Sequence, residues 1–340
     1  MIRRIIVVLL SLALSLLVAE IGLRNLRPVG FRAVPVIESE DVWRQLLHQA
    51  SAIDGLAYEL APNKTGFAKG TTVTTNSHGM RGPELLADGP DLFRVAVVGD
   101  SFAFGFGVAA EQTFAAVLTR ELRRSGLPGW RYEVLNFGVG GYSSRDEALV
   151  LQHRVLPLHP DVVIVAYALN DPEIEPIQPL HAYYATTHWW QHLHLARLIA
   201  ATRWQHKLDR FGDGDYYQYL HAEPRSWQSV IDAFAEMSRA TRETRTPLIL
   251  AILTGGRHND WKHYPYRALH EQIGTAAAEQ HMTVADTLPF MSRFAPQVTR
   301  ISRHDDHFSP KGHMVVARAL YLSLAKLGTL PKVPADEKSR

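Results

Sequence analysis

The chain has 340 residues, 46% hydrophobic and 21% charged, which provides enough apolar surface for a substantial core and excludes a disordered or fibrous protein. Its 36 Lys and Arg against 34 Asp and Glu leave a formal charge of +2, without the basic stripe that phosphate backbones require, so nucleic acid is not an expected partner. The absence of cysteine excludes disulfides, thiolate metal sites and cysteine nucleophiles.

An apolar segment lies near the amino end. Ile5–Ala19 carries no charge and, continued to Leu23, would form a helix about 28 Å long, close to the roughly 30 Å hydrocarbon thickness of a bilayer. Arg3 and Arg4 precede it and favour a cytoplasmic amino end, with the rest of the chain outside the cytoplasm. A cleaved signal peptide and a buried core helix are the alternatives, although small residues are poorly placed for cleavage. We therefore expect an uncleaved membrane anchor.

The segment after the anchor, from about Pro28 to Asp91, shows little sustained periodicity and contains several prolines and glycines. Such a composition is typical of turns joined by short strands. We interpret it as an accessory lead-in to the main domain.

From Arg94 onward, short apolar runs rich in β-branched residues alternate with longer amphipathic stretches. The runs are typical of buried strands, and the longer stretches have the periodicity of helices. Strands that are apolar throughout and alternate with helices indicate a mostly parallel sheet covered on both faces, which is an α/β fold. The expected strands are 94–101, 132–139, 161–171, 247–254 and 282–286, and the expected helices are 111–124, 143–156, 226–244, 266–280 and 310–327.

An aromatic segment at about 173–224 interrupts this alternation. We interpret it as an inserted amphipathic helix that covers the carboxyl edge of the sheet or lies at the membrane surface, with Trp189, Trp190 and Trp204 offering apolar rings with polar tips.

Histidines in the same insertion have a spacing that metal ligands also use. His188 and His192 lie four residues apart, but Leu195 and Ile199 continue that helical face and no carboxylate recurs at ligand spacing. We therefore expect no metal site here.

The organisation expected from these segments has four parts. They are a membrane anchor or signal peptide at 1–27, the lead-in at 28–91, the main domain at 92–330 with the insertion at about 173–224, and a tail at 331–340.

Polar motifs follow the strands at the points where chemistry is expected. In open α/β sheets, active sites lie beyond the carboxyl ends of the strands. The motifs at these positions are Gly99-Asp100-Ser101, Asn136 to Gly141, Ala168 to Asp171 and, before the last helix, His304 to Pro310.

Ser101 and His307 are the pair that best fits nucleophilic acyl transfer. A serine hydroxyl becomes nucleophilic when an imidazole accepts its proton, and Ser101 lies where a strand enters the glycine-rich loop FAFGFG. His307 precedes a helix whose start is indicated by Ser309 as N-cap and Pro310 at the first helical position. The positive end of that helix helps to keep the imidazole neutral and able to act as a base.

The same reaction requires hydrogen-bond donors for the tetrahedral oxyanion. The backbone N–H groups of Ser101 and Gly141 and the side-chain amide of Asn170 can provide three, each worth roughly 3 kcal/mol in comparable sites.

Each of these residues also has a plainer interpretation. Ser101 could cap a helix, Asn170 could cap a turn, and the glycines that end at Gly141 could mark a tight turn, although no G-x-G-x-x-G frame is completed. We expect structural roles for Arg81 in the lead-in and for His313 on the apolar face of the last helix.

Four motifs together resemble a known family. GDSFAFGFGV, NFGVGGYSS, ALND and DDHFSPKGH are similar, in order and spacing, to the four blocks of the SGNH/GDSL hydrolases, serine esterases and lipases with a flavodoxin-like three-layer α/β/α sandwich. The resemblance covers residues 94–327 and implies Ser101 as nucleophile and first oxyanion donor. It likewise implies Gly141 and Asn170 as further donors and His307 as base. NSHGMRGPE behind an apolar amino-terminal helix also resembles the membrane-anchored bacterial members.

The sequence departs from the family pattern at two positions. Ala168 replaces the glycine of the usual GxND block, while Asn170 is retained. His304 occupies the position of the aspartate in the usual DxxH block. We expect Asp305, two residues before the imidazole, to take its place, with Asp306 or a backbone carbonyl as the alternatives.

We therefore expect a serine hydrolase that cleaves ester-linked acyl groups, as an esterase or carbohydrate O-deacetylase, on the extracytoplasmic face of a membrane. Its partners would be an acylated small molecule, lipid or glycan and the membrane itself, and no cofactor or metal is expected. An O-acyltransferase acting on an envelope or exported polysaccharide is the nearest alternative. A non-catalytic scaffold on the same fold is the alternative from another class.

Overall fold

Five parallel strands form the central sheet in the computed structural model, which describes residues 1–26, 47–68, 70–174, 193–256 and 258–331. Neighbouring strands pair in parallel in the order β6-β5-β7-β8-β9, the flavodoxin-like order 2-1-3-4-5. The α/β prediction is thereby confirmed. The strands are β5 (Leu92–Gly99), β6 (Arg131–Gly138), β7 (Val162–Tyr167), β8 (Leu248–Ile252) and β9 (Thr283–Asp286).

The sheet is buried on both faces because the strands are apolar throughout. In β5, Val95 and Val97 pack into one hydrophobic cluster, and Ala96 and Val98 pack into the other. Successive side chains of a strand point to opposite faces, so this division places one helical layer on each side.

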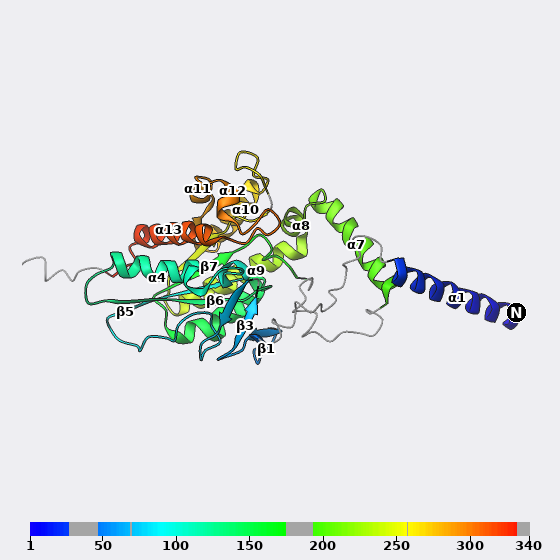
Figure 1. Cartoon of the computed structure of the whole chain (residues 1–340), viewed down its shortest axis with the longest axis horizontal. Coiled ribbons are helices and arrows are strands. Elements are labelled where there is room, and N and C mark those ends of the chain that lie inside the picture. The colour runs from blue at the N-terminus through cyan, green and yellow to red at the C-terminus, as the bar shows by residue number, and fades with distance from the viewer. Residues whose placement is uncertain (27–46, 69, 175–192, 257, 332–340) are drawn as a thin grey trace, which may run out of the picture.

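Two helical layers complete the sandwich (Figure 1). One layer consists of the neighbouring helices α4 and α13, and the other contains α5, α9 and α10. Their bounds are α4 (Phe114–Ser125), α13 (Pro310–Leu327), α5 (Ser144–Val150), α9 (Pro224–Glu243) and α10 (Arg267–Glu279).

The last helix begins and ends at the residues expected from the sequence. The Ser309 side chain accepts a hydrogen bond from the Gly312 N–H at 3.2 Å, and Pro310 occupies the first helical position. Gly328 ends the helix in the left-handed conformation.

The helix expected over 143–156 is regular only in its first half. After α5 the chain widens into a π-helical turn at η3 (Leu151–Val155) and then tightens into a 3₁₀ turn at η4 (Leu156–Leu158). Pro157 has no N–H to continue an α-helical ladder, and His159 ends the segment with a φ of 50°. Short elements elsewhere are α3 (Ser101–Phe104), η2 (Ala110–Gln112), α11 (Leu288–Met291) and α12 (Pro296–Thr299).

The described part of the lead-in contains two antiparallel pairs, β1–β2 and β3–β4. The Tyr58 hydroxyl donates to the Gly140 carbonyl at 2.9 Å, and the Tyr142 hydroxyl donates to the Tyr58 carbonyl at 2.7 Å. The lead-in therefore braces the glycine-rich turn after β6. The bounds are β1 (His48–Ala50), β2 (Tyr58–Leu60), β3 (Thr65–Ala68) and β4 (Thr71–Thr74).

The amino-terminal helix α1 (Ile2–Leu26) extends away from the sandwich (Figure 1) and is long and apolar enough to cross a membrane. A signal sequence would pass the same test of length and composition. Near its end, the Glu20 carboxylate accepts hydrogen bonds from the N–H groups of His194 and Leu195, at 3.0 and 2.9 Å. Glu20 thus caps the first turn of the inserted helix α7 (His194–Gly212).

The insertion also reaches the sheet. Helix α8 (Tyr216–Ala222) follows α7, and its His221 ring lies 3.0 Å from the Tyr167 hydroxyl at the end of β7. His188, His192, Trp189 and Trp190, and the side chain of Trp204, lie outside the described residues.

Candidate active site

Ser101 lies at the carboxyl end of β5. A Cβ at Gly99 would come within 2.6 Å of the Ala103 Cβ, so the tight turn from strand to helix requires glycine there. Asp100 caps α3 by accepting the Phe102 N–H at 2.9 Å. Ser101 is therefore the first helical residue rather than the cap, and its side chain remains half-buried at the edge of the sheet.

Ser101, His307 and Asp305 lie within hydrogen-bonding distance in a chain of three groups. The Ser101 Oγ is 2.8 Å from Nε2 of His307, and Nδ1 of that ring is 2.6 Å from Oδ1 of Asp305. A proton on Nδ1, directed at the carboxylate, leaves Nε2 free to accept the hydroxyl proton. The structure thus brings together three residues that the sequence singled out.

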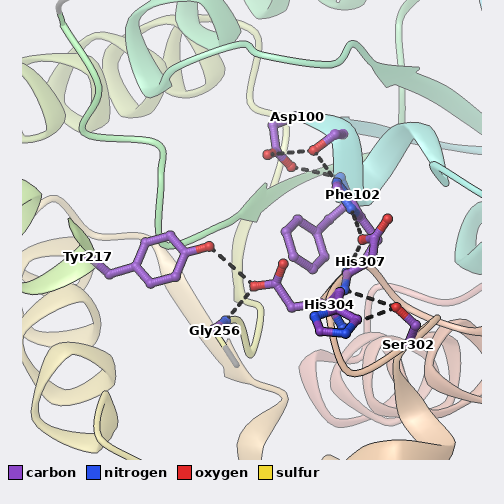
Figure 2. A network of polar contacts seen from close by, with 10 residues as sticks. Asp100, Phe102, Tyr217, Gly256, Ser302, His304 and His307 are labelled. Atoms are coloured by element: carbon purple, nitrogen blue, oxygen red, sulfur yellow. Dashed lines mark hydrogen bonds and ion pairs between the residues drawn. The ribbon is translucent and has the colours of Figure 1, made fainter. Parts of the chain in front are cut away.

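Asp306 turns in the opposite direction. Its Oδ2 accepts hydrogen bonds from the Gly256 N–H at 2.7 Å and from the Tyr217 hydroxyl at 3.2 Å, as Figure 2 shows around Tyr217 and Gly256. The two aspartates differ because Asp305 bends back towards His307. Its Oδ1 accepts a hydrogen bond from the His307 backbone N–H and lies within hydrogen-bonding distance of Nδ1 of the ring. Of the two adjacent aspartates, only Asp305 contacts the imidazole.

Two phenyl rings hold the His307 imidazole in place. The ring centroids of Phe102 and Phe106 lie 4.8 and 5.2 Å from that of His307. Both phenylalanines are buried, whereas the His307 side chain is 20% exposed. The ring is therefore fixed by packing yet open to solvent on one side. The FAFGFG motif contains both rings, but nothing in its pattern indicates that they pack against this histidine.

Residues that carry the three expected oxyanion donors lie close to Ser101. A Cβ at Gly140 would be 3.8 Å from the Ser101 Cβ, and Gly141 follows with a φ of +84° that favours glycine. The N–H groups of Ser101 and Gly141 donate to no described residue. Asn170 leaves the expected strand 161–171, because β7 ends at Tyr167 and a turn carries its side chain towards Ser101.

Asp100 connects two parts of this site. Its Oδ2 accepts a hydrogen bond from the Asn170 amide at 3.0 Å and lies 3.2 Å from the Ser101 Oγ. Burial raises the pKa of Asp100, although the hydrogen bonds from Asn170 and from the Phe102 N–H act in the opposite direction. No role for Asp100 was predicted from the sequence, and only its place between Gly99 and Ser101 could have indicated one.

A set of buried carboxyl groups lies behind these donors. Glu147 is fully buried and Asp171 is 1% exposed, and neither the two Glu147 oxygens nor Oδ1 of Asp171 has a hydrogen-bond partner among the described residues. Burial raises the pKa of both groups well above the ordinary values, and repulsion by Asp100 adds to the effect at each of them. These acids bind protons more tightly in the folded protein than in the unfolded chain.

Glu147→Gln is expected to stabilise the protein at neutral pH. The elevated folded pKa means that stability from Glu147 is full below its ordinary pKa of 4.5 and is lost as the pH rises above it. A neutral glutamine avoids this loss, so the variant should gain about 2 kcal/mol at pH 8 and much less at pH 4.5. Thermal unfolding between pH 4.5 and 8 measures the effect, with exposed Glu279→Gln as the control. A variant that is less stable at every pH would contradict this expectation.

Metal ligation has one candidate group among the described residues. The ligand atoms of Asp305, Asp306 and His307 all lie within 4.8 Å of one another. The contacts with Ser101 and Gly256 already account for the positions of these side chains.

Arg81 and His313 both have structural contacts. The Arg81 guanidinium donates to the carbonyls of Phe104, Gly105 and Val108, and His313 Nδ1 accepts the Phe114 N–H at 3.1 Å. Burial lowers the pKa of His313 to about 3, so this ring stays neutral.

Solved structures similar to this chain include several esterases. An Enterococcus faecalis lipase/acylhydrolase is 16% identical and covers 72% of this chain and 100% of its own, with a TM-score of 0.43. An acetyl xylan esterase is 15% identical and covers 68% of this chain and 100% of its own, with a TM-score of 0.45. A mutant of a Geobacillus acetyl-xylooligosaccharide esterase is 18% identical and covers 72% of this chain and 97% of its own, with a TM-score of 0.45. No curated protein matches the chain.

A family model matches the part of the chain that carries this site. The match runs over residues 97–315, from the end of β5 through β6, β7, β8 and β9 to the first turns of α13, and the model describes GDSL-like lipases and acylhydrolases. Serine at the end of β5 and histidine before α13 both fall inside it. The chain therefore belongs to the GDSL-like lipase/acylhydrolase family of ester-hydrolysing enzymes.

Proposed function

We propose that the protein hydrolyses ester-linked acyl groups through a covalent acyl-enzyme on Ser101, with His307 as base and Asp305 as the carboxylate that orients it. The observation that carries this proposal is the chain of two short contacts from Ser101 through His307 to Asp305, at 2.8 and 2.6 Å. Nucleophile and base within hydrogen-bonding reach, with the base oriented by a third group, is the arrangement that activates a serine.

In the first half of the reaction, Nε2 of His307 accepts the hydroxyl proton as the Ser101 Oγ bonds to the ester carbonyl carbon. The carbonyl electron pair moves onto its oxygen, which the N–H groups of Ser101 and Gly141 and the amide of Asn170 receive. Collapse of this intermediate breaks the bond to the alcohol, which takes the proton from Nε2. The acyl group remains on Ser101.

In the second half, water replaces the alcohol. His307 removes a proton from the water as its oxygen attacks the acyl carbon, and the Ser101 Oγ leaves with that proton. The 20% and 18% exposure of the His307 and Asp305 side chains favours access of water to this step. We therefore favour hydrolysis over transfer to a sugar hydroxyl.

We propose acylated glycans or lipids outside the cytoplasm as the substrates. α1 is a candidate membrane span, and Arg3 and Arg4 at its start favour a cytoplasmic amino end. On this view residues 1–27 anchor the enzyme, residues 28–91 lead to the catalytic domain at 92–330, and the insertion at 173–224 lies between domain and membrane.

Covalent labelling tests the proposal. The full chain, purified in detergent, should hydrolyse p-nitrophenyl acetate and react with a fluorophosphonate at Ser101, located by peptide mass spectrometry. Ser101→Ala should lose both properties, while the exposed Ser292→Ala control should retain them. Neither turnover nor labelling in the native chain would indicate a scaffold, and acyl-sugar formed when a sugar acceptor is added would indicate a transferase.

A further inference from the structure

A second pocket lies beside the proposed catalytic loop, at the same edge of the sheet. The segment after β8 lines it with Thr254 and Gly256, and the loop that leads to α13 lines it with Arg300, Asp306 and Phe308. Its volume is about 20 Å³, which is enough for one small polar group. In α/β sheets this edge is where ligands bind, so a polar group without a partner in this lining is a candidate ligand contact.

Arg300 is such a group. Arg300 is only 7% exposed, and among the described residues Nε and Nη1 of its guanidinium have no hydrogen-bond partner. Within the described ranges it forms no ion pair either. The acid in the pocket, Asp306, directs its Oδ2 instead at the Gly256 N–H and the Tyr217 hydroxyl (Figure 2). In the part of the chain that the structure describes, this buried cation in the pocket wall therefore has no carboxylate in contact with it.

The chemistry of this cation indicates the ligand. A buried charge is costly unless it is paired, and the planar guanidinium fork matches the paired oxygens of carboxylate or phosphate. The half-buried His258 also lines the pocket, and burial together with the charge of Arg300 lowers its pKa. The positive charge of Arg300 therefore also acts on His258, which belongs to the segment after β8.

We propose that this pocket binds an oxyanion, a carboxylate or phosphate group carried by the ester substrate, with Arg300 as its donor. The substrate part of this inference rests on the proposed function. The two sites share one loop: Arg300 pairs with Phe308 across a β-bridge, and the Phe308 ring packs 4.9 Å from Phe102, next to Ser101. An anion held at Arg300 would therefore position an ester near the nucleophile.

Binding of inorganic phosphate tests the pocket without any catalytic step. In the full-length Ser101→Ala protein, phosphate should raise Tm by several degrees over sodium chloride of equal ionic strength, because a ligand that binds only the folded state stabilises it. Adding Arg300→Gln should abolish this rise, and adding Arg300→Lys should retain part of it. Arg303→Gln removes an exposed charge from the same loop and should leave the rise intact. Equal shifts in all four proteins would overturn the proposal.

A matched pair of esters then distinguishes a substrate group from a free anion. In the native enzyme, kcat/KM for acetylated glucuronic acid should exceed that for acetylated glucose about tenfold, and Arg300→Gln should bring the ratio to about one. A ratio near one in the native enzyme, with phosphate still bound at Arg300, would overturn the substrate part. If neither ester is cleaved, the proposed function fails, while the phosphate result still decides the pocket.

Discussion

His307→Ala is expected to lower kcat for ester hydrolysis by about 10⁶-fold, and Ser101→Ala by a similar factor. The 2.8 Å contact joins nucleophile and base into one unit, so losing either leaves the other without function. The double variant should therefore be no slower than either single variant. The residual rate would come from substrate binding and from the oxyanion donors, which neither substitution removes.

Steady-state hydrolysis of p-nitrophenyl acetate by the full chain measures these rates, with circular dichroism to verify that each variant is folded. His304→Ala provides the matched control, because His304 belongs to the same loop but is exposed and contacts the Arg303 side chain. Its rate should stay within a few fold of the native rate. Multiplicative losses in the double variant would show that the two residues act independently and would refute the proposed pair.

Asp305→Asn should reduce kcat by about 10⁴-fold, the second largest effect. The carboxylate accepts the Nδ1 proton at 2.6 Å, and this bond selects the tautomer in which Nε2 can accept a proton. An amide can donate to Nδ1 and so favours the wrong tautomer. It also removes the negative charge that stabilises the imidazolium formed during the reaction.

Asp306→Asn is the matched comparison, since it makes the same change one residue away. Asp306 contacts Gly256 and Tyr217 and not the imidazole, so we expect a loss below about tenfold that arises from a less ordered loop. The measurement is the ratio of kcat for Asp306→Asn to kcat for Asp305→Asn. Equal losses would mean that the loop as a whole, and not the Asp305 carboxylate, orients His307.

Much of the fold could be predicted because it depends on local patterns. Apolar β-branched runs located the five strands, and Ser309 and Pro310 located the start of α13. The predicted ends of strands and helices were less accurate where they depend on tertiary contacts. β7 stops at Tyr167 because Asp171 forms a turn with Ala168, and the helix from 143 changes geometry before Pro157.

The candidate site was predictable only as a list of residues. Motif order identified Ser101, Gly141, Asn170 and His307, and spacing favoured Asp305 over Asp306. The spacing of residues along the sequence does not give the distances between their side chains. The buried Glu147 belongs to a helix whose pattern does not distinguish a solvated acid from one packed against the sheet.

By itself, the sequence determined the α/β class, the family and the residues at which chemistry is expected, because apolar periodicity and short motifs are properties of neighbouring residues. Only the tertiary structure decided which aspartate reaches the imidazole and that Asp100 holds Asn170. It also decided that Nε and Nη1 of Arg300 are buried with no partner among the described residues. Such contacts join segments up to about 200 residues apart, and they depend on the packing of the whole sheet and its loops.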